Sequence, residues 1–321
     1  MLWLSRPPID RVIRRRDTDG EPPDDRLLRR GVERGELRRI APGTYVPTAD
    51  WQVLTPLARH AQLVWDAAAR GEPGRVFGLF AAAALHGMDI LGPWPESIDV
   101  LVDRRGGGRS TGRIRRHSRD LARVAVAPWG TNFVTTPLQT AVDLIAAVRH
   151  LEGVVVADQA LWARRSGGPL VRHEDLLSAA HSRTGRGAAR AARAADFATP
   201  LADSVRESQS RVLIQAMGFP EPELQAAFVL SDGSRAFADF FWRDHRHIGE
   251  FDGVGKYADP ALLRGRTPRQ ALVAEKDRED DLRRQVDAFS RWRTPALDDP
   301  RVLYNILRGA GLPTRRPRPG R

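Results

Sequence analysis

Cysteine is absent from this chain of 321 residues, and its absence excludes several kinds of chemistry. There can be no disulfide, no thiolate metal ligand and no cysteine nucleophile, which fits a reducing compartment. No run of about 18 apolar residues occurs, so we expect no membrane-spanning helix and no membrane partner. The apolar stretch Leu2–Leu4 ends before Arg6 and Pro7 and is too short for a signal peptide. We therefore expect a cytoplasmic protein.

Lysine is scarce as well, so almost all of the positive charge comes from arginine. The formal net charge is +11. Guanidinium groups match the geometry of phosphate, and an arginine-rich chain is therefore a candidate for binding nucleic acid. A GC-rich genome would also raise arginine at the expense of lysine, so the charge alone leaves both explanations open.

The first 55 residues carry a short helical pattern followed by a basic hairpin. Residues 14–25 are charged and interrupted by Gly and Pro, as in a loop. Leu27, Leu28 and Val32 then suggest a helix, and "ELRRIAPGTYVP" reads as strand, Pro-Gly turn and strand. This order is typical of the last helix and wing of a winged helix, although a small surface hairpin would look similar. The candidate DNA contacts here are Arg34, Arg38 and Arg39.

The rest of the chain divides by its pattern into further segments. Residues 56–195 alternate helical and strand patterns, with Thr136 predicted to cap a helix that begins at Pro137. Residues 196–310 read as helix, three strands, helix and strand. The basic tail, 311–321, is expected to be disordered. The predicted class is α+β or α/β, with a winged-helix-like segment at 1–55, a mixed α/β domain and an αβββαβ core.

The stretch "GEFDGVGKY" places Glu250 and Asp252 on one face of a predicted strand. A hairpin loop centred between Asp244 and His245 would set Trp242 opposite His247 and Asp239 opposite Glu250. Like charges opposed in a covered sheet are destabilising, unless one carboxyl is protonated or a hard divalent cation lies between them. A slipped register, with both acids facing solvent or paired with arginines, is the alternative.

The segment 203–283 resembles the PD-(D/E)xK nuclease superfamily in its very-short-patch-repair (Vsr)-like branch. The matching stretches are "RESQSRVLIQAMGFPEPELQ", "SRAFADFFW", "HIGEFDGVGKY" and "EKDREDDLR". The resemblance implies a restriction-endonuclease-like core in which Asp239 and Glu250 hold Mg²⁺ or Mn²⁺ and Glu207 supports the metal or its water. The family's lysine would lie two positions after Glu250, where this chain has Asp252. Lys256 is the candidate replacement.

Each of these residues also has a structural explanation. Ser204 and Glu207 have the spacing of a helix capping box, Asp252-Gly253 suits a turn, and Lys256 could be an ordinary loop lysine. Glu275, Arg278 and Asp281 fall three apart, so they line either the site or a solvated helix face. We include Arg278 among the candidate nucleic-acid contacts. His245 and His247 flank the hairpin turn and are expected to be surface histidines.

A second resemblance concerns the N-terminal half. The stretches "RRGVERGELRRIAPGTYVP", "FAAAALHGMDILGP" and "TTPLQTAVDL" resemble type IV antitoxins of the AbiEi kind. Within this half, His86 is expected to be a packed or capping histidine. The resemblance implies DNA binding and a possible cognate toxin as partner.

Two functions from different classes follow. The first is a Mg²⁺-dependent DNA endonuclease or nickase, in which a metal-activated water hydrolyses a phosphodiester. The second is a DNA-binding regulator or antitoxin whose nuclease-like domain has no activity. RNA processing is a weaker third option, because the same metal chemistry would permit it.

Overall fold

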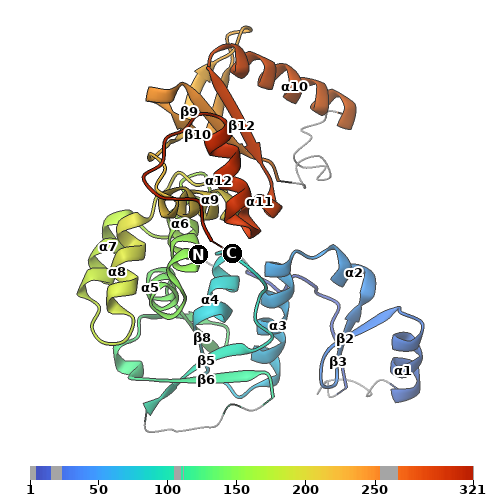
Figure 1. Cartoon of the computed structure of the whole chain (residues 1–321). Coiled ribbons are helices and arrows are strands. Elements are labelled where there is room, and N and C mark those ends of the chain that lie inside the picture. Colours follow the sequence, from blue (N-terminus) through green and yellow to red (C-terminus); the bar gives the residue numbers. More distant parts are fainter. Residues whose placement is uncertain (1–4, 16–23, 105–109, 111, 254–266, 321) are drawn as a thin grey trace. The chain divides into compact units, whose positions relative to one another are not determined.

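The computed structural model describes residues 5–15, 24–104, 110, 112–253 and 267–320 (Figure 1). It confirms a mixed fold of helices and sheets. The chain forms two compact units. Unit 1 contains Met1–Leu161 and Pro169–Ala198, and unit 2 contains Trp162–Gly168 and Thr199–Arg321. Within the described ranges, no helix is both long enough and apolar enough to cross a bilayer.

The start of unit 1 is a small three-stranded sheet with strand order β1-β3-β2. Its elements are β1 (Ile13–Arg14), α1 (Asp25–Glu33), β2 (Leu37–Ala41), β3 (Thr44–Pro47) and α2 (Thr48–Val53). The predicted helix and hairpin are therefore confirmed, with Gly43 turning the chain at a φ of 72°. Ile40 of β2, Val46 of β3 and Trp51 of α2 are buried and pack in one apolar core.

The remainder of unit 1 surrounds a five-stranded mixed sheet with strand order β6-β5-β4-β8-β7. Thr136 caps a helix as predicted, since its hydroxyl accepts a hydrogen bond from the Gln139 backbone N–H and Pro137 occupies the first turn. His86 is buried, with Nε2 2.7 Å from the Thr135 carbonyl oxygen, which confirms a packed histidine. The elements are α3 (Pro56–Arg70), β4 (Val76–Phe77), α4 (Leu79–His86), β5 (Ile98–Asp103), β6 (Ile114–Arg119), β7 (Val126–Trp129), β8 (Asn132–Thr135), α5 (Pro137–Ala147), α6 (His150–Leu161), α7 (His173–Ser182) and α8 (Ala188–Phe197).

Unit 2 is built on a four-stranded sheet with strand order β12-β11-β10-β9. The strands β9, β10 and β11 are antiparallel neighbours, whereas β12 lies parallel to β11 after the chain crosses over through α10. Its elements are α9 (Val205–Ala216), β9 (Glu223–Val229), β10 (Arg235–Trp242), β11 (His247–Phe251), α10 (Pro268–Arg284), β12 (Ala288–Trp292), α11 (Thr294–Asp298) and α12 (Pro300–Gly309). The order from α9 to β12 is helix, three strands, helix, strand.

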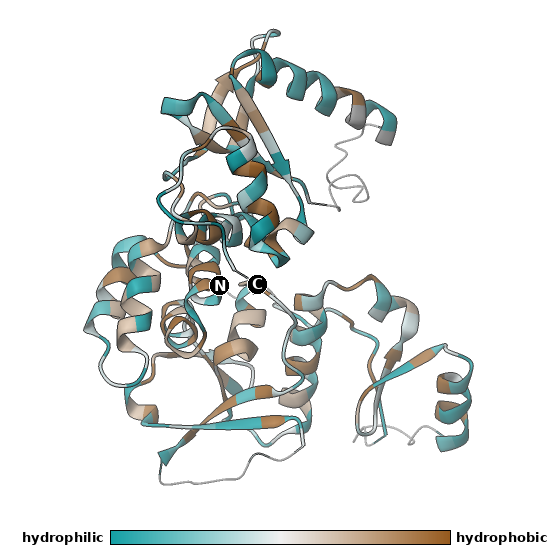
Figure 2. Ribbon diagram, in the orientation of Figure 1, coloured by the Kyte–Doolittle hydropathy of each residue, from teal (hydrophilic) through white to brown (hydrophobic). Residues whose placement is uncertain are grey.

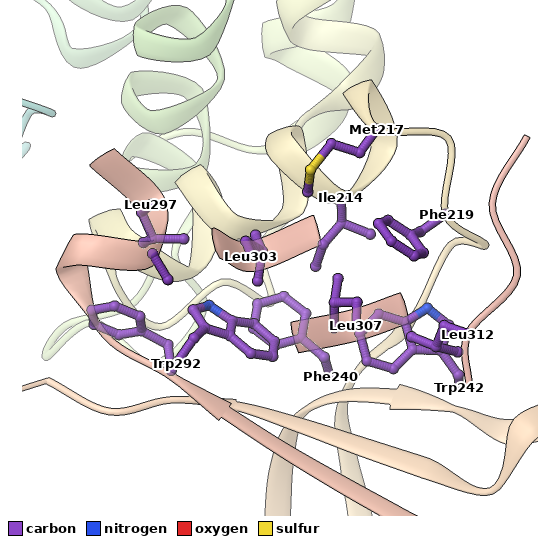
Figure 3. Close-up of a cluster of buried hydrophobic side chains, with 12 residues drawn as sticks. Ile214, Met217, Phe219, Phe240, Trp242, Trp292, Leu297, Leu303, Leu307 and Leu312 are labelled. Carbon is purple, nitrogen blue, oxygen red and sulfur yellow. The ribbon is translucent and has the colours of Figure 1, made fainter. Parts of the chain in front are cut away.

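Each face of this sheet has its own apolar core. On one face, Phe240, Trp242 and Trp292 pack against α9, α11 and α12 (Figure 3). On the other face, a smaller cluster includes Phe241 and Leu282, and Leu282 comes from α10. Most of α10 is hydrophilic along its length (Figure 2), so the helix covers this face largely with charged side chains. The polar site described below forms on this sheet.

Gly249 in β11 lies between two tryptophans. A methyl group added at this position is therefore expected to destabilise unit 2. A Cβ at this position would lie 2.7 Å from Trp292 Cη2 and 3.0 Å from Trp242 Cζ3. Both indoles are fixed, because the Trp242 N–H donates to the Pro220 carbonyl and the Trp292 N–H donates to the Ser210 hydroxyl. We expect Gly249→Ala to lower the free energy of unfolding of unit 2 by about 1–3 kcal/mol through overpacking.

Gly309 provides the matched control for this substitution. It lies at the end of α12, and a Cβ there would have no described heavy atom within 4 Å. Gly309→Ala should leave stability unchanged or raise it slightly, because alanine favours helix. Urea unfolding monitored by hydrogen exchange in β10–β12 would compare the two. Equal stabilities of both variants would contradict this account of the core.

Two sequence predictions are wrong in unit 2. His247 is buried rather than exposed, with Nε2 2.8 Å from Ser290 Oγ, and burial lowers its pKa to about 4. The start of the basic tail is also ordered, because Leu312 is buried and the Thr314 hydroxyl donates to the Met217 carbonyl at 2.6 Å. Arg316 likewise donates to the Ala216 carbonyl. Composition favours disorder, but these groups satisfy carbonyls left free at the end of α9.

Candidate functional site

The hairpin of β10 and β11 has the predicted register. Trp242 pairs with His247, Phe241 with Ile248 and Phe240 with Gly249. Continuing this register by one residue sets Asp239 opposite Glu250. Asp239 Oδ2 accepts a hydrogen bond from the Phe251 backbone N–H at 2.9 Å. Asp239 is therefore tied to β11 at the point where that strand ends.

Gln225 in β9 lies opposite Asp239 on the other side of β10. The neighbouring pairs Ala238–Ala226 and Phe240–Leu224 fix this position. Gln225 has a φ of 52°, in the left-handed region that a residue with a side chain rarely adopts. Such a conformation costs about 1–3 kcal/mol and is typical of sites where the surroundings hold it in place.

The strained backbone places the Gln225 amide between two carboxylates. Its Nε2 donates to Glu207 Oε2 at 3.2 Å and lies 3.4 Å from Asp239 Oδ1. Glu207 lies in the first turn of α9 and Asp239 lies in β10. We call Glu207, Gln225, Asp239 and Glu250 the carboxylate site.

Glu207 closes the start of α9 and also faces Asp239. Its Oε2 accepts the Asp203 backbone N–H at 2.9 Å, and the Ser204 hydroxyl donates to Oε1. The Glu207 backbone N–H in turn donates to Ser204 Oγ, which confirms the predicted cap. Burial, followed by repulsion from Asp239, raises the pKa of Glu207 to about 7. Glu207 therefore both caps α9 and forms part of the carboxylate site.

This raised pKa predicts how stability depends on pH. The unfolded chain binds the proton with the ordinary pKa of 4.5, whereas the folded protein binds it with a pKa of about 7. Between these values the folded state binds more protons, so the free energy of unfolding should fall as pH rises from about 4.5 to about 7. The fall attributable to Glu207 is at most about 3 kcal/mol.

Glu207→Gln should remove most of this decline. Its stability, measured by urea unfolding from pH 5 to pH 8, should vary less than that of the wild type and should exceed it above pH 7. Glu221→Gln, an exposed glutamate beside β9, is the control and should leave the slope unchanged. A wild-type slope that survives Glu207→Gln would contradict the assignment.

Glu250 is buried and neutralised by two arginines. Its Oε1 accepts from Arg278 Nη2 at 2.8 Å, and its Oε2 accepts from Arg291 Nη2 at 2.9 Å. Arg278 comes from α10 and also donates to the Phe237 carbonyl. Arg291 is the direct neighbour of Glu250 in the parallel pairing of β11 with β12. These two ion pairs therefore offset the repulsion that Glu250 would otherwise experience from Asp239.

The other predicted residues have different environments. Asp252 makes an ion pair with Arg293, at 2.6 Å between Oδ2 and Nη2. Lys256 lies outside the described residues. Glu275 contacts Arg278, so this part of α10 lines the site, whereas Asp281 turns away to bind the Ser231 backbone and hydroxyl.

The three arginines predicted to contact DNA in unit 1 are exposed. Arg34 follows the last residue of α1, and Arg38 and Arg39 lie in β2. The Arg38 guanidinium lies 5.5 Å from the Trp51 ring centroid. The role of these three arginines in binding DNA stays a prediction. The predicted DNA contact of Arg278 also stays a prediction, and the guanidinium of Arg278 is bound to Glu250.

Glu207 and Asp239 supply carboxylate oxygens, the ligand type that a hard divalent cation prefers, and each of these oxygens accepts a hydrogen bond in the structure. Two carboxylate oxygens converge there on one amide group, and Mg²⁺ prefers such oxygen ligands. Glu250 differs in the charge of its partners, because both of its oxygens are held by guanidinium groups. Among the described residues there is no cluster of three or more His, Asp or Glu side chains that could hold a metal ion. Metal binding by Asp239 with Glu250 stays a prediction.

Sequence reasoning missed three residues of this arrangement. Gln225 could have been found by extending the register across the "SDGS" turn to β9. Arg291 could not, because parallel pairing across α10 leaves no local signal. Arg164 could not either, since it comes from the separate segment Trp162–Gly168 and reaches Gln225 Oε1 at 2.8 Å.

Comparison with known proteins yields relatives in one organism. No protein-family model matches the chain. The "Uncharacterized protein Rv2248" of Mycobacterium tuberculosis strain H37Rv is 30% identical over 201 residues, which cover 59% of this chain and 67% of that protein. The "Uncharacterized protein MT2308" of strain CDC 1551 matches to the same extent. The chain therefore belongs to the same family as these two mycobacterial proteins.

Proposed function

We propose that unit 2 is a divalent-metal-dependent DNA endonuclease or nickase of the PD-(D/E)xK type. The observation that carries the proposal is the Glu207–Gln225–Asp239 arrangement, in which two carboxylates from α9 and β10 share one amide and one of them has a raised pKa. The helix–three strands–helix–strand order supports the same assignment, as does the position of Glu250 beside Asp239. Perturbed carboxylates of this kind are typical of functional sites.

In this proposal Asp239 and Glu207 hold Mg²⁺ or Mn²⁺. The ion would lower the pKa of a bound water and stabilise negative charge on the phosphoryl group. The chain's own residues position the ligands: Phe251 N–H fixes Asp239, and Asp203 N–H fixes Glu207. Arg278 and Arg291 form ion pairs with Glu250 beside them. Lys256 remains the candidate cation suggested by the sequence.

A second candidate function is DNA binding without hydrolysis, as a regulator or antitoxin. Two observations favour it: both oxygens of Glu250 are held by arginines, and Asp252 occupies the position of the family's lysine. The AbiEi-like stretches of unit 1 and its exposed arginines would then carry the function. A cognate toxin would be a further partner in this case.

One pair of measurements separates the two candidates. Supercoiled plasmid is incubated with the full chain in Mg²⁺ or in EDTA, and DNA binding is measured in EDTA at several salt concentrations. The nuclease proposal predicts nicked or linear product only with Mg²⁺. The regulator predicts salt-dependent binding with no product. Cleavage that continues in EDTA would overturn the metal-dependent mechanism.

A further inference from the structure

The segment Trp162–Gly168 is part of unit 2 although the residues on both sides of it in sequence belong to unit 1. Two of its side chains hold Asp203 in place. The Trp162 indole N–H donates to Asp203 Oδ1 at 3.0 Å, and Arg164 Nη1 donates to Asp203 Oδ2. Asp203 in turn gives its backbone N–H to Glu207. The segment is therefore connected directly to the carboxylate site.

Arg164 is fixed from three sides. Besides Asp203, its Nη1 donates to Gln225 Oε1 at 2.8 Å, and its guanidinium lies 5.1 Å from the centroid of the Phe237 ring. Gln225 and Phe237 lie in β9 and β10, beside Asp239. An arginine held in this way has lost its rotamer freedom before any ligand arrives, so binding costs less entropy.

One edge of this guanidinium is uncommitted. Among the described residues, Arg164 makes its hydrogen bonds through Nη1 alone, which leaves Nε and Nη2 available, and its side chain is 46% exposed. The neighbouring arginines differ in this respect. Arg278 and Arg291 are committed to Glu250, and Arg293 gives both Nε and Nη2 to Asp252.

We propose that Arg164 is a phosphate-binding residue of the carboxylate site, and that its Nε–Nη2 edge takes the non-bridging oxygens of a nucleic-acid phosphodiester. This assignment rests on the proposed action of unit 2 on DNA. The planar fork of arginine matches two oxygens of a phosphate, which is why a fixed arginine suits this ligand. An anionic phosphate near Glu207 and Asp239 also needs a cation beside it, and Asp252 stands where the family's lysine would be.

The test compares three variants of the full chain: Arg164→Gln, Arg164→Lys and the control Arg243→Gln. Arg243 directly follows the last residue of β10, with its guanidinium 5.3 Å from the Phe241 ring centroid and in an ion pair with Glu223. Like Arg164, it combines an ion pair with a contact to a phenylalanine ring, but it is not a neighbour of Glu207 or Asp239. Binding of a fluorescent DNA duplex is measured in EDTA from about 50 to 200 mM salt, and thermal unfolding of each variant is recorded.

We expect Arg164→Gln to bind about five- to tenfold more weakly near 100 mM salt and to reduce the slope of log K against log salt by about 0.9. Arg164→Lys should keep the slope, because it keeps the charge, and should lower kcat where cleavage is measurable, because it loses the fork. Arg243→Gln should match the wild type.

If the slope of log K against log salt were unchanged in Arg164→Gln, the assignment would be overturned, whatever the melting temperature of the variant. The loss of a phosphate contact must reduce the number of counterions released on binding. An equal reduction in Arg243→Gln, or no DNA binding by the wild type at low salt, would overturn it too. The expected slopes without Mg²⁺-dependent cleavage would support Arg164 as a phosphate contact and overturn the nuclease proposal.

Discussion

Glu250→Gln is expected to destabilise unit 2 by about 2–4 kcal/mol. The substitution removes the one negative charge that Arg278 and Arg291 share, and leaves Glu275 and Glu279 as their remaining acidic partners. Glu250 has a side chain that is 8% exposed, while the two arginines are 25% and 28% exposed. Breaking a fully buried ion pair costs about 3–5 kcal/mol, and the partial exposure of the arginines lowers this figure.

Hydrogen exchange of β10–β12 peptides would measure this loss in unit 2 alone. Glu223→Gln is the matched control, because Glu223 pairs with Arg243 on the same sheet but is exposed, and such surface pairs contribute about 0–1 kcal/mol. If Glu250→Gln were no more destabilising than Glu223→Gln, the two arginines would not be bound to Glu250 as described.

Asp239→Asn is expected to lower Mg²⁺-dependent cleavage by at least about 100-fold, which corresponds to about 2.7 kcal/mol of transition-state stabilisation. The amide oxygen of asparagine can still accept the Phe251 N–H, so the fold should persist. DNA binding in EDTA should be retained or strengthened, since one negative charge is lost.

The appropriate control for this substitution is Asp244→Asn, an exposed position in the turn between β10 and β11. Its cleavage rate should equal that of the wild type in a plasmid-nicking assay. Cleavage by Asp239→Asn at the wild-type rate would place the active site elsewhere, and the carboxylate site would then have no catalytic role.

The hairpin at the centre of the site could be predicted from sequence for a physical reason. A short turn fixes the register of two antiparallel strands, so the position of the turn near Asp244 determines that Asp239 and Glu250 meet. The capping of α9 was also predictable, because Ser204 and Glu207 are three residues apart. Both features depend on contacts that are local in sequence.

The electrostatic partners of the acids could not be predicted in the same way. Glu250 meets Arg291 through a parallel pairing that depends on how α10 crosses the sheet, and this requires the fold rather than the local pattern. Arg164 reaches Gln225 from 61 residues away in the sequence. His247 shows the same limitation, since a histidine next to a turn gives no sign that β12 will bury it.

The most direct test of the central claim, that this site binds a catalytic metal, is anomalous diffraction from crystals of the full chain soaked in Mn²⁺. We expect an anomalous peak in contact with the Asp239 carboxylate, and the loss of that peak in Asp239→Asn. Absence of a peak at Asp239 in wild-type crystals, with Mn²⁺ in excess, would contradict it and favour DNA binding without hydrolysis.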